Sequence, residues 1–415
     1  MSDAKSRDVF RLPGYLAFWT AETVSEFGTY ITTLALQVLV VVTLQGTATD
    51  VGLLNAARWL PYMVFGLVIG ALVDRWRRKP ILVATDLGRA VLLGAIPGLW
   101  LLGWLSLPML MGFVALFGLL TLLNDAASQS FVPRLVPASL LVPANARLDQ
   151  GAAVAQTSGP LVAGGLVTAL GAPLAVLVDA ASYLVSALVV WRIPIAEPKP
   201  RSDVRPHLRR EIVEGLAFVY RHRMLAPFAI GTHGWFLFNS MLVTVFTPFA
   251  LLELKLTPFE LGVALAAAGG AGLLGSLSAA RIGRAWGAGG AVIACRALMP
   301  AGWAVIALAP AAGGVWTVAA LALGQGLYGL AMGAVNANEM GYRQAVTPDA
   351  LQGRMNTTMR SINRAMIVVG APAGGWLADT IGHRPTLWIA IAGVAAVTLY
   401  LAASPFRHAR HDQSD

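Results

Sequence analysis

The stretch "GALVDRWRRKP", from Gly70 to Pro80, gathers five charged residues into the six positions 74–79. Long apolar stretches lie on both sides of it, over 51–72 and 81–102, and each contains only one or two charges. An apolar run of about 20 residues is long enough to cross the hydrocarbon core of a bilayer as a helix. The pattern therefore predicts two membrane-spanning helices that are joined by a short, basic loop.

The composition extends this prediction to the whole chain. Of its 415 residues, 57% are hydrophobic and 12% are charged, and the mean hydropathy is +0.67. A soluble protein needs a largely polar exterior, which this composition cannot supply. The predicted fold is therefore an all-α polytopic membrane protein with twelve transmembrane helices. We expect them at 15–44, 51–72, 80–102, 108–130, 146–169, 173–191, 224–251, 259–282, 289–309, 315–341, 355–378 and 384–403.

The first apolar run is expected to remain in the protein as an uncleaved helix. It is too long for the core of a signal peptide, and no A-x-A-like cleavage site closes it.

The distribution of lysine and arginine predicts the orientation in the membrane, because loops on the cytoplasmic side are enriched in these residues. One set of alternate loops contains nearly all of them: Lys5, Arg7, Arg11, 75–79, Arg134, 192–223, Arg281, Arg284, Arg343 and Arg407. The opposite set contains only Lys255 and Arg384. We expect a protein of the cytoplasmic membrane with both termini in the cytoplasm. Topology also accounts for the net charge of +9, so no nucleic-acid partner is expected.

The chain is expected to consist of two similar halves. The longest polar stretch, 192–223, separates a six-helix bundle at 1–191 from a second bundle and a polar tail at 224–415, and it ends in an amphipathic segment that we expect on the membrane surface. The segment that begins at Val136 resembles the one that begins at Thr347, at an offset of 211 residues. Duplicated six-helix halves are typical of transporters, whose substrate site lies at the interface of the halves.

The basic loop resembles a motif of the major facilitator superfamily, G-x-L-x-D-R-x-G-R-[RK]. The matching residues are Gly70, Leu72, Asp74, Arg75, Arg78 and Lys79, whereas Arg77 stands where the family usually has glycine. The stretches "SFVPRLVPASLLVPANARLDQ" and "VLVDAASYLVSAL" are similar to the branch that contains macrolide efflux pumps and the enterobactin exporter. This resemblance implies twelve helices in two bundles and export of drugs or siderophores, usually by proton antiport.

The resemblance also implies a gate at the cytoplasmic end, where this loop contacts the start of the eleventh helix in the closed state. We expect the gate to contain Gly70, Asp74, Arg75, Arg78 and Asp125. The alternative is a solvated charge cluster that reflects topology alone.

Two acidic residues of the first helix are candidates for proton coupling. Glu22 and Glu26 are four residues apart and share a helical face. Ionisable residues inside a membrane are costly, so each is a functional candidate. We expect Glu26 to be the main coupling carboxylate, with Glu22 assisting and Arg58 approaching in one state. Alternatively, Glu22 lies at the interface and only Glu26 is deep.

Polar residues in other spans are candidates for a substrate cavity and for charge pairs. The expected cavity residues are Gln37, Tyr30, Gln156, His233, Asn239 and Asn336, although a single histidine in a membrane helix is more often a satisfied hydrogen-bond partner. Asp86 and Arg89, three residues apart, are expected to pair within their helix. Glu339 is expected to pair with Arg360 or Arg364.

Other function classes lack their motifs. No lysine follows a glycine, so the phosphate-binding G-x-x-x-x-G-K-[ST] of an ATP-driven pump is missing. G-x-S-x-G and H-E-x-x-H are also missing, so we expect no enzyme, no cofactor and no metal site. The expectation is a monomeric secondary active transporter in contact with lipid, which exports a small, partly hydrophobic solute by proton antiport. An importer, a facilitator, a lipid flippase or a non-transporting receptor remain alternatives.

Overall fold

The computed structural model describes residues 9–73, 76–195, 197, 208–311 and 313–410. This part of the chain is almost entirely helical and contains no strand. The first six long helices are α2 (Tyr15–Val38), α3 (Ala48–Val73), α4 (Arg78–Leu101), α5 (Leu107–Leu135), α6 (Leu141–Leu170) and α7 (Ala172–Arg192). They are followed by α8 (Leu208–Arg221), α9 (Leu225–Pro248), α10 (Pro258–Ala307), α11 (Val315–Val346), α12 (Asp349–Ile381) and α13 (His383–Ala403).

The expected spans are all helical, and two of them form one long element. The spans expected at 259–282 and 289–309 both lie in α10, which is interrupted where Gly287 adopts a φ of 70°. A left-handed backbone suits glycine because it has no Cβ. Within the described residues, nine helices are long and apolar enough to cross a membrane, α10 being counted once.

Backbone details recur between the two parts of the chain and support an internal repeat. π-helical turns extend α2 over Leu39–Thr43 and α9 over Phe249–Glu253. Gln45 and Lys255, which follow these turns, are the non-glycine residues with positive φ in the described part of the chain, at 53° and 58°. Such values are uncommon outside glycine, and their recurrence at an offset of 210 residues is what an internal repeat predicts.

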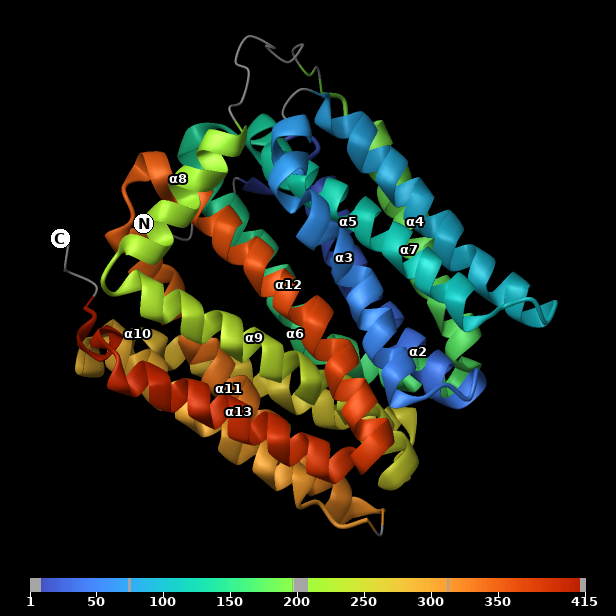
Figure 1. The fold of residues 1–415 in the computed structure, drawn as a ribbon. Helices are drawn as coiled ribbons and strands as arrows, with labels where there is room; N and C mark the ends of the chain where they lie inside the picture. Colours follow the sequence, from blue (N-terminus) through green and yellow to red (C-terminus); the bar gives the residue numbers. More distant parts are fainter. Residues whose placement is uncertain (1–8, 74–75, 196, 198–207, 312, 411–415) are drawn as a thin grey trace.

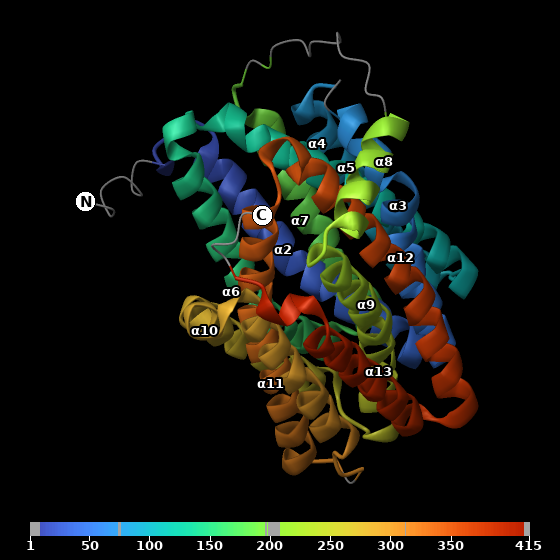
Figure 2. The same ribbon diagram turned by 60° about the vertical axis from the view of Figure 1, so that its left-hand side comes forward.

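The helices form two packed groups. Most contacts of α2, α4, α5 and α7 lie within the first group and most of those of α9, α11 and α13 within the second, whereas α3 packs most extensively on α12, and α6 on α10, so that the groups meet chiefly there. Figures 1 and 2 show α12 running beside α3, and α8 crossing the ends of α9 and α12. We call the end of the molecule that bears α8 the linker end. The opposite end, with the short connections from α2 to α3 and from α12 to α13, is called the short-loop end.

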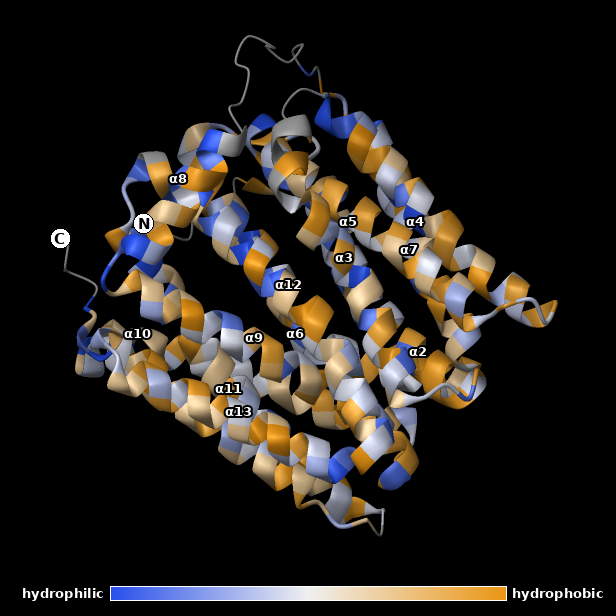
Figure 3. Ribbon diagram, in the orientation of Figure 1, coloured by the Kyte–Doolittle hydropathy of each residue, from blue (hydrophilic) through white to orange (hydrophobic). Residues whose placement is uncertain are grey.

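Hydrophobic residues are frequent along the helices of both groups (Figure 3), and many of them are exposed. Large hydrophobic residues such as Val91, Leu274 and Leu399 are 68%, 62% and 70% exposed. Water would make such a surface unfavourable, whereas lipid chains solvate it. The surface is that of a multi-pass membrane protein.

Candidate functional site

A central cavity lies where the two groups of helices meet. Its larger lobe, about 1000 Å³, is lined by α2, α6, α9, α10 and α11, and its smaller lobe, about 490 Å³, lies mainly between α9, α10, α11 and α12. The two lobes adjoin, because they share six lining residues: Val243, Tyr328, Met332, Asn336, Glu339 and Arg343. The cavity is large enough for a drug-sized solute.

Five of the six expected cavity residues line this space. Tyr30, Gln37 and Gln156 line the larger lobe, Asn239 lines the smaller one, and Asn336 lines both. Aromatic rings provide much of the remaining wall: Trp59, Phe228, Trp235, Phe236, Phe246, Trp303 and Tyr328. A few fixed polar groups among apolar rings are typical of sites for partly hydrophobic ligands.

His233 occupies a different position from the one expected. It is absent from the described lining of either lobe, and its ring lies 2.7 Å from the hydroxyl of Tyr220 in α8 and 2.6 Å from the amide oxygen of Asn363 in α12. The ring therefore joins the surface helix to two spanning helices. Its sequence environment could not reveal this role, because both partners lie on other helices.

The groups are closely packed toward the short-loop end. Glycine allows the backbones to touch there: a Cβ at Gly52 would lie 2.4 Å from the carbonyl oxygen of Ala371, and one at Gly375 would lie 2.2 Å from that of Ala48. Gly164, which corresponds to Gly375 at the offset of 211 residues, makes a similar contact: a Cβ there would lie 2.6 Å from the carbonyl oxygen of Pro258. No side chain fits at these three positions, so the cavity is closed at this end.

A carboxylate reinforces this closure. Asp379, at the end of α12, accepts hydrogen bonds from the backbone N–H groups of Ala48 at 3.0 Å and Thr49 at 2.8 Å, and from the Thr49 hydroxyl. These are the free donors at the start of α3, where the helix dipole also favours a negative charge. Asp379 thus joins the two groups across the short-loop end.

Side-chain hydrogen bonds between the two groups of helices are also found toward the short-loop end. Besides Asp379, those within the described ranges are Asn55 to Thr244 at 3.3 Å and Thr247 to Gln37. All of them lie between the short-loop end and the cavity. Other described contacts between the groups are of a different kind: Arg364 lies over the Trp59 ring, and Asp125 interacts electrostatically with Arg360 and Arg364.

The expected gate lies at that linker end and is only partly described. Asp74 and Arg75 lie outside the described residues, and for Gly70 the structure gives the helical backbone of α3 alone. Arg78 begins α4 and donates a hydrogen bond to the carbonyl oxygen of Trp76 at 3.3 Å. Asp125 accepts a hydrogen bond from the Tyr62 hydroxyl at 2.7 Å. A gate at these residues therefore remains a prediction.

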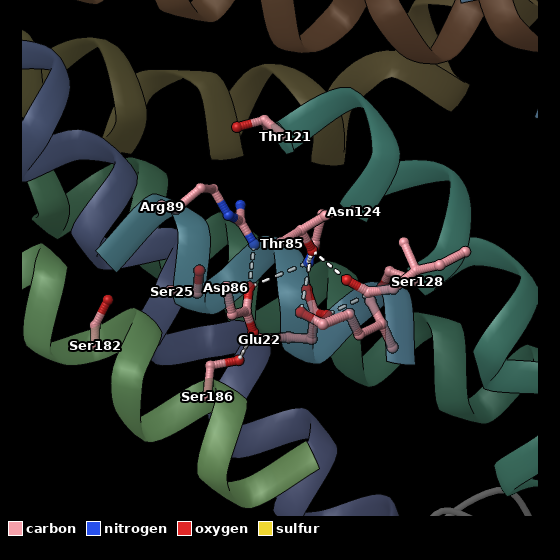
Figure 4. Close-up of polar contacts among 12 residues, drawn as sticks. Glu22, Ser25, Thr85, Asp86, Arg89, Thr121, Asn124, Ser128, Ser182 and Ser186 are labelled. Atoms are coloured by element: carbon pink, nitrogen blue, oxygen red, sulfur yellow. Dashed lines mark hydrogen bonds and ion pairs between the residues drawn. The ribbon is translucent and has the colours of Figure 1, made fainter. Parts of the chain in front are cut away.

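The first group of helices contains a buried polar network, shown in Figure 4. Asp86 and Arg89 form the expected ion pair, and Asp86 also accepts hydrogen bonds from Ser186 at 2.7 Å and Asn124 at 3.1 Å. The Arg89 guanidinium lies 4.1 Å from the ring centroid of Tyr183. The Asp86 carboxylate is thus held by three donors, although Nε of Arg89 has no hydrogen-bond partner among the described residues.

Glu22 and Glu26 border this network but differ in their contacts. Glu22 accepts a hydrogen bond from Ser128 at 3.0 Å (Figure 4), whereas Glu26 makes no hydrogen bond within the described residues and interacts electrostatically with Asp125 and Arg89. Arg58 donates to the Thr33 hydroxyl at 2.8 Å. It therefore does not pair with either glutamate in this conformation.

The expected pairing of Glu339 was wrong. Its carboxylate forms an ion pair at 2.5 Å with Arg296, a residue of α10 whose side chain is 2% exposed. Arg364 instead stacks 3.9 Å from the ring centroid of Trp59, and both Arg360 and Arg364 interact electrostatically with Asp125. Arg296 was missed, although a single arginine within the apolar span 289–309 is a signal that the sequence does contain.

The described residues contain no cluster of three or more metal-ligating side chains.

Known proteins with similar sequences and structures are transporters. The chain is 26% identical over 226 residues to macrolide efflux protein A of Streptococcus pyogenes, which covers 52% of this chain and about half, 54%, of that protein. The structure resembles that of the nucleoside transporter NupG, with a TM-score of 0.75 at 11% identity over 94% of this chain and 98% of NupG.

A bacterial homologue of the iron transporter ferroportin has been solved in two states. It superposes with a TM-score of 0.71 in its inward-facing state, at 15% identity over 94% of this chain and 98% of that one. In its outward-facing state the TM-score is 0.58, at 16% identity and the same coverage. These likenesses are to the fold. The sequence model of the Major Facilitator Superfamily matches residues 18–371, and the chain therefore belongs to this superfamily of membrane transporters.

Proposed function

We propose that the protein is a secondary active exporter that moves a small, partly hydrophobic solute across the cytoplasmic membrane by alternating access. The observation that carries this proposal is the central cavity between two groups of helices, closed toward the short-loop end by Asp379 and the glycine contacts. The halves 1–191 and 224–415 would rock about this cavity while the linker 192–223 keeps them joined.

The orientation follows from the positive-inside rule. The linker end carries most of the loop arginines, so we place it in the cytoplasm, and the structure then represents an inward-facing state. The higher TM-score against the inward-facing ferroportin homologue supports this assignment. An exporter in this state would load its solute from the cytoplasm or the inner leaflet.

We place proton coupling at Glu26, assisted by Glu22. Glu26 lies one helical turn from Tyr30, which lines the larger lobe, although Glu26 itself is not among the described lining residues of either lobe. A carboxylate without a hydrogen-bond partner can exchange its proton without breaking a fixed contact. Arg58, held by Thr33 in this state, would approach the carboxylate when the halves rock and release the proton.

The direction of transport is supported by a single comparison. The name of the similar macrolide efflux protein favours export. An importer, a facilitator or a lipid flippase would have the same fold, and a transport measurement separates them.

Uphill transport in vesicles tests the function. Everted membrane vesicles with the protein, given an inward-acidic pH gradient, should accumulate one or more members of a panel of drugs and siderophores, and a protonophore should abolish the accumulation. Vesicles without the protein are the control. Accumulation that survives collapse of both the pH gradient and the membrane potential would contradict proton coupling. Solute that leaves the vesicles together with the protons would contradict export.

A further inference from the structure

Arg296 is a buried cation with donors to spare in the wall of the smaller lobe. Its Nη2 donates to the Thr232 hydroxyl at 2.9 Å and to Glu339 at 2.5 Å. Its Nε and Nη1 have no acceptor among the described residues, although the side chain is only 2% exposed. A buried N–H group without an acceptor is costly, so this site favours a ligand that can accept a hydrogen bond.

The charge of the smaller lobe favours the same kind of ligand. Three arginines line it, Arg296, Arg343 and Arg364, against the single carboxylate of Glu339. Even with Glu339 paired to Arg296, the lobe has a formal excess of two positive charges. In a cavity with low-dielectric walls, such an excess attracts an anion and repels a cation.

The arginines are combined with aromatic faces. The Arg296 guanidinium lies 6.0 Å from the ring centroid of Phe228 and 5.9 Å from that of Trp235, while Arg364 stacks on Trp59. The larger lobe adjoins through Tyr328 and Met332 and is mostly apolar. A ligand that fills both lobes would therefore have a charged head and an apolar body.

We propose that the smaller lobe binds the anionic group of the transported solute, with Arg296 as its main contact, and that the solute is an amphipathic organic anion such as an aromatic carboxylate or sulfonate. This inference rests on the proposed transport function, since it names the class of solute. Nη1 of Arg296 is enclosed in this conformation, so a small rotation of the side chain would let the anion accept its hydrogen bond, while Arg343 and Arg364 add charge. Its apolar body would lie along Tyr328 in the larger lobe.

A purely structural role for Arg296 is the competing interpretation. The residue joins α9 through Thr232 and α11 through Glu339, so replacing it alone would also leave a buried carboxylate unpaired. The test therefore uses the double variant Arg296→Gln/Glu339→Gln, which removes both charges at once. Arg281→Gln is the matched control, because it removes an exposed arginine from the same helix, α10.

The experiment measures equilibrium binding of two dyes with the same xanthene skeleton to the purified full-length protein in lipid nanodiscs. Fluorescein is an anion and rhodamine 123 a cation at slightly alkaline pH. We expect the unmodified protein to bind fluorescein about tenfold more tightly than rhodamine 123, because a charge-assisted hydrogen bond is worth roughly tenfold or more in affinity. The double variant should lose this preference, Arg364→Gln should weaken it, and Arg281→Gln should keep it.

Two results would overturn the inference: equal or stronger binding of rhodamine 123 by the unmodified protein, or an unchanged preference in the double variant. The thermal stability of the double variant is measured as well. If it is near that of the unmodified protein, a lost preference for fluorescein is due to the binding site and not to misfolding. Because dye binding is measured without transport, a failure of the vesicle experiment would leave this result interpretable. Conversely, transport of cations alone would contradict the solute class while leaving the transporter function intact.

Discussion

Glu26 differs from Glu22 and Asp86 because it makes no hydrogen bond within the described residues. Asp86 is bonded to Arg89, Ser186 and Asn124, and Glu22 is bonded to Ser128. Carboxylates that are held by several donors serve structure, since any change in protonation would break those bonds. Glu26 can therefore change protonation at a lower cost than Glu22 or Asp86.

Replacing Glu26 with Gln should therefore abolish uphill transport driven by a pH gradient, while substrate binding and downhill exchange persist. A neutral amide cannot carry a proton, yet it conserves the shape of the side chain. Accumulation in everted vesicles and exchange in proteoliposomes measure the two activities. Glu22→Gln should have a smaller effect. If Glu26→Gln pumps normally and Asp125→Asn does not, the proton follows another route.

A second residue-scale prediction concerns Gly28, which lies against the buried Asp179. A Cβ at Gly28 would lie 1.9 Å from Oδ1 of Asp179, whose carboxylate accepts hydrogen bonds from Thr32 and Ser182. Gly28→Ala should thus destabilise the protein by about 1–3 kcal/mol, as overpacking does. Thermal unfolding in detergent measures the change. Gly94→Ala in α4 is the control, since no atom lies within 4 Å of its Cβ position; equal melting of the two variants would refute the steric argument.

At the scale of helices, the contact between the end of α12 and the start of α3 should control access at the short-loop end. Asp379→Asn removes a charge from the positive end of a helix dipole, an effect of about 1 kcal/mol, or roughly a fivefold change in population. The variant should populate the state that is open at this end. Spin labels at Gln45→Cys and Trp316→Cys, in a Cys295→Ser background, should then show a broader and longer distance distribution.

Asp50→Asn is the matched control for this prediction. Asp50 accepts a hydrogen bond from the Thr47 N–H at 2.8 Å, so it also caps the start of α3, but within one group of helices. Its loss should weaken the helix end without separating the groups. A change as large as that of Asp379→Asn would show that capping alone, not the link across the groups, determines the distances.

The docking of α8 on α12 should depend on one carboxylate. Arg210 donates to Glu214 at 2.7 Å and Arg354 also pairs with it, and these guanidinium groups lower the pKa of Glu214 from its usual 4.5. A carboxyl group with a lowered pKa contributes its full stabilisation above its usual pKa and loses it as the pH falls through the lowered one. Docking should therefore be complete at neutral pH and weaken only once the pH has fallen below the usual glutamate pKa of 4.5.

Glu214→Gln should reproduce the low-pH behaviour at neutral pH. A spin label at the exposed Val213→Cys, again without Cys295, should become more mobile in this variant and, at a pH below the lowered pKa of Glu214, in the unmodified helix. Glu211→Gln in the same helix is the control, because Glu211 makes no ion pair within the described residues. Label mobility that is the same in all three proteins would show that Glu214 does not hold α8.

At the scale of the whole molecule, the proposed inward-facing state makes a prediction about access to the cavity. Gln156→Cys, in the larger lobe and without Cys295, should react with a membrane-impermeant thiol reagent faster in everted vesicles than in right-side-out vesicles. The reason is that the short-loop end is closed by backbone contacts at Gly52, Gly164 and Gly375. The opposite order of rates would mean that the resting state or the orientation differs from the proposal.

The sequence by itself determined the helical membrane fold, and five of the six residues that it predicts for a substrate cavity line the central cavity. Apolar runs of about 20 residues can satisfy their backbone in lipid only as helices, so local composition decides each span. The cavity residues could be predicted for a related reason: a polar side chain in such a run is costly in lipid and therefore faces the interior of the protein. The pairing of Asp86 with Arg89 was predictable because both lie on one helix.

Only the tertiary structure decided which side chains meet across helices. Glu339 pairs with Arg296 rather than Arg360 or Arg364, His233 bonds to Tyr220 and Asn363, and Asp379 caps α3. Each of these contacts depends on the rotation and depth of two packed helices. Spans that are apolar on nearly every face give little periodic signal for the rotation or the depth of a helix. Both are set here by the close approach of backbones at glycine, which is visible only once the helices are packed.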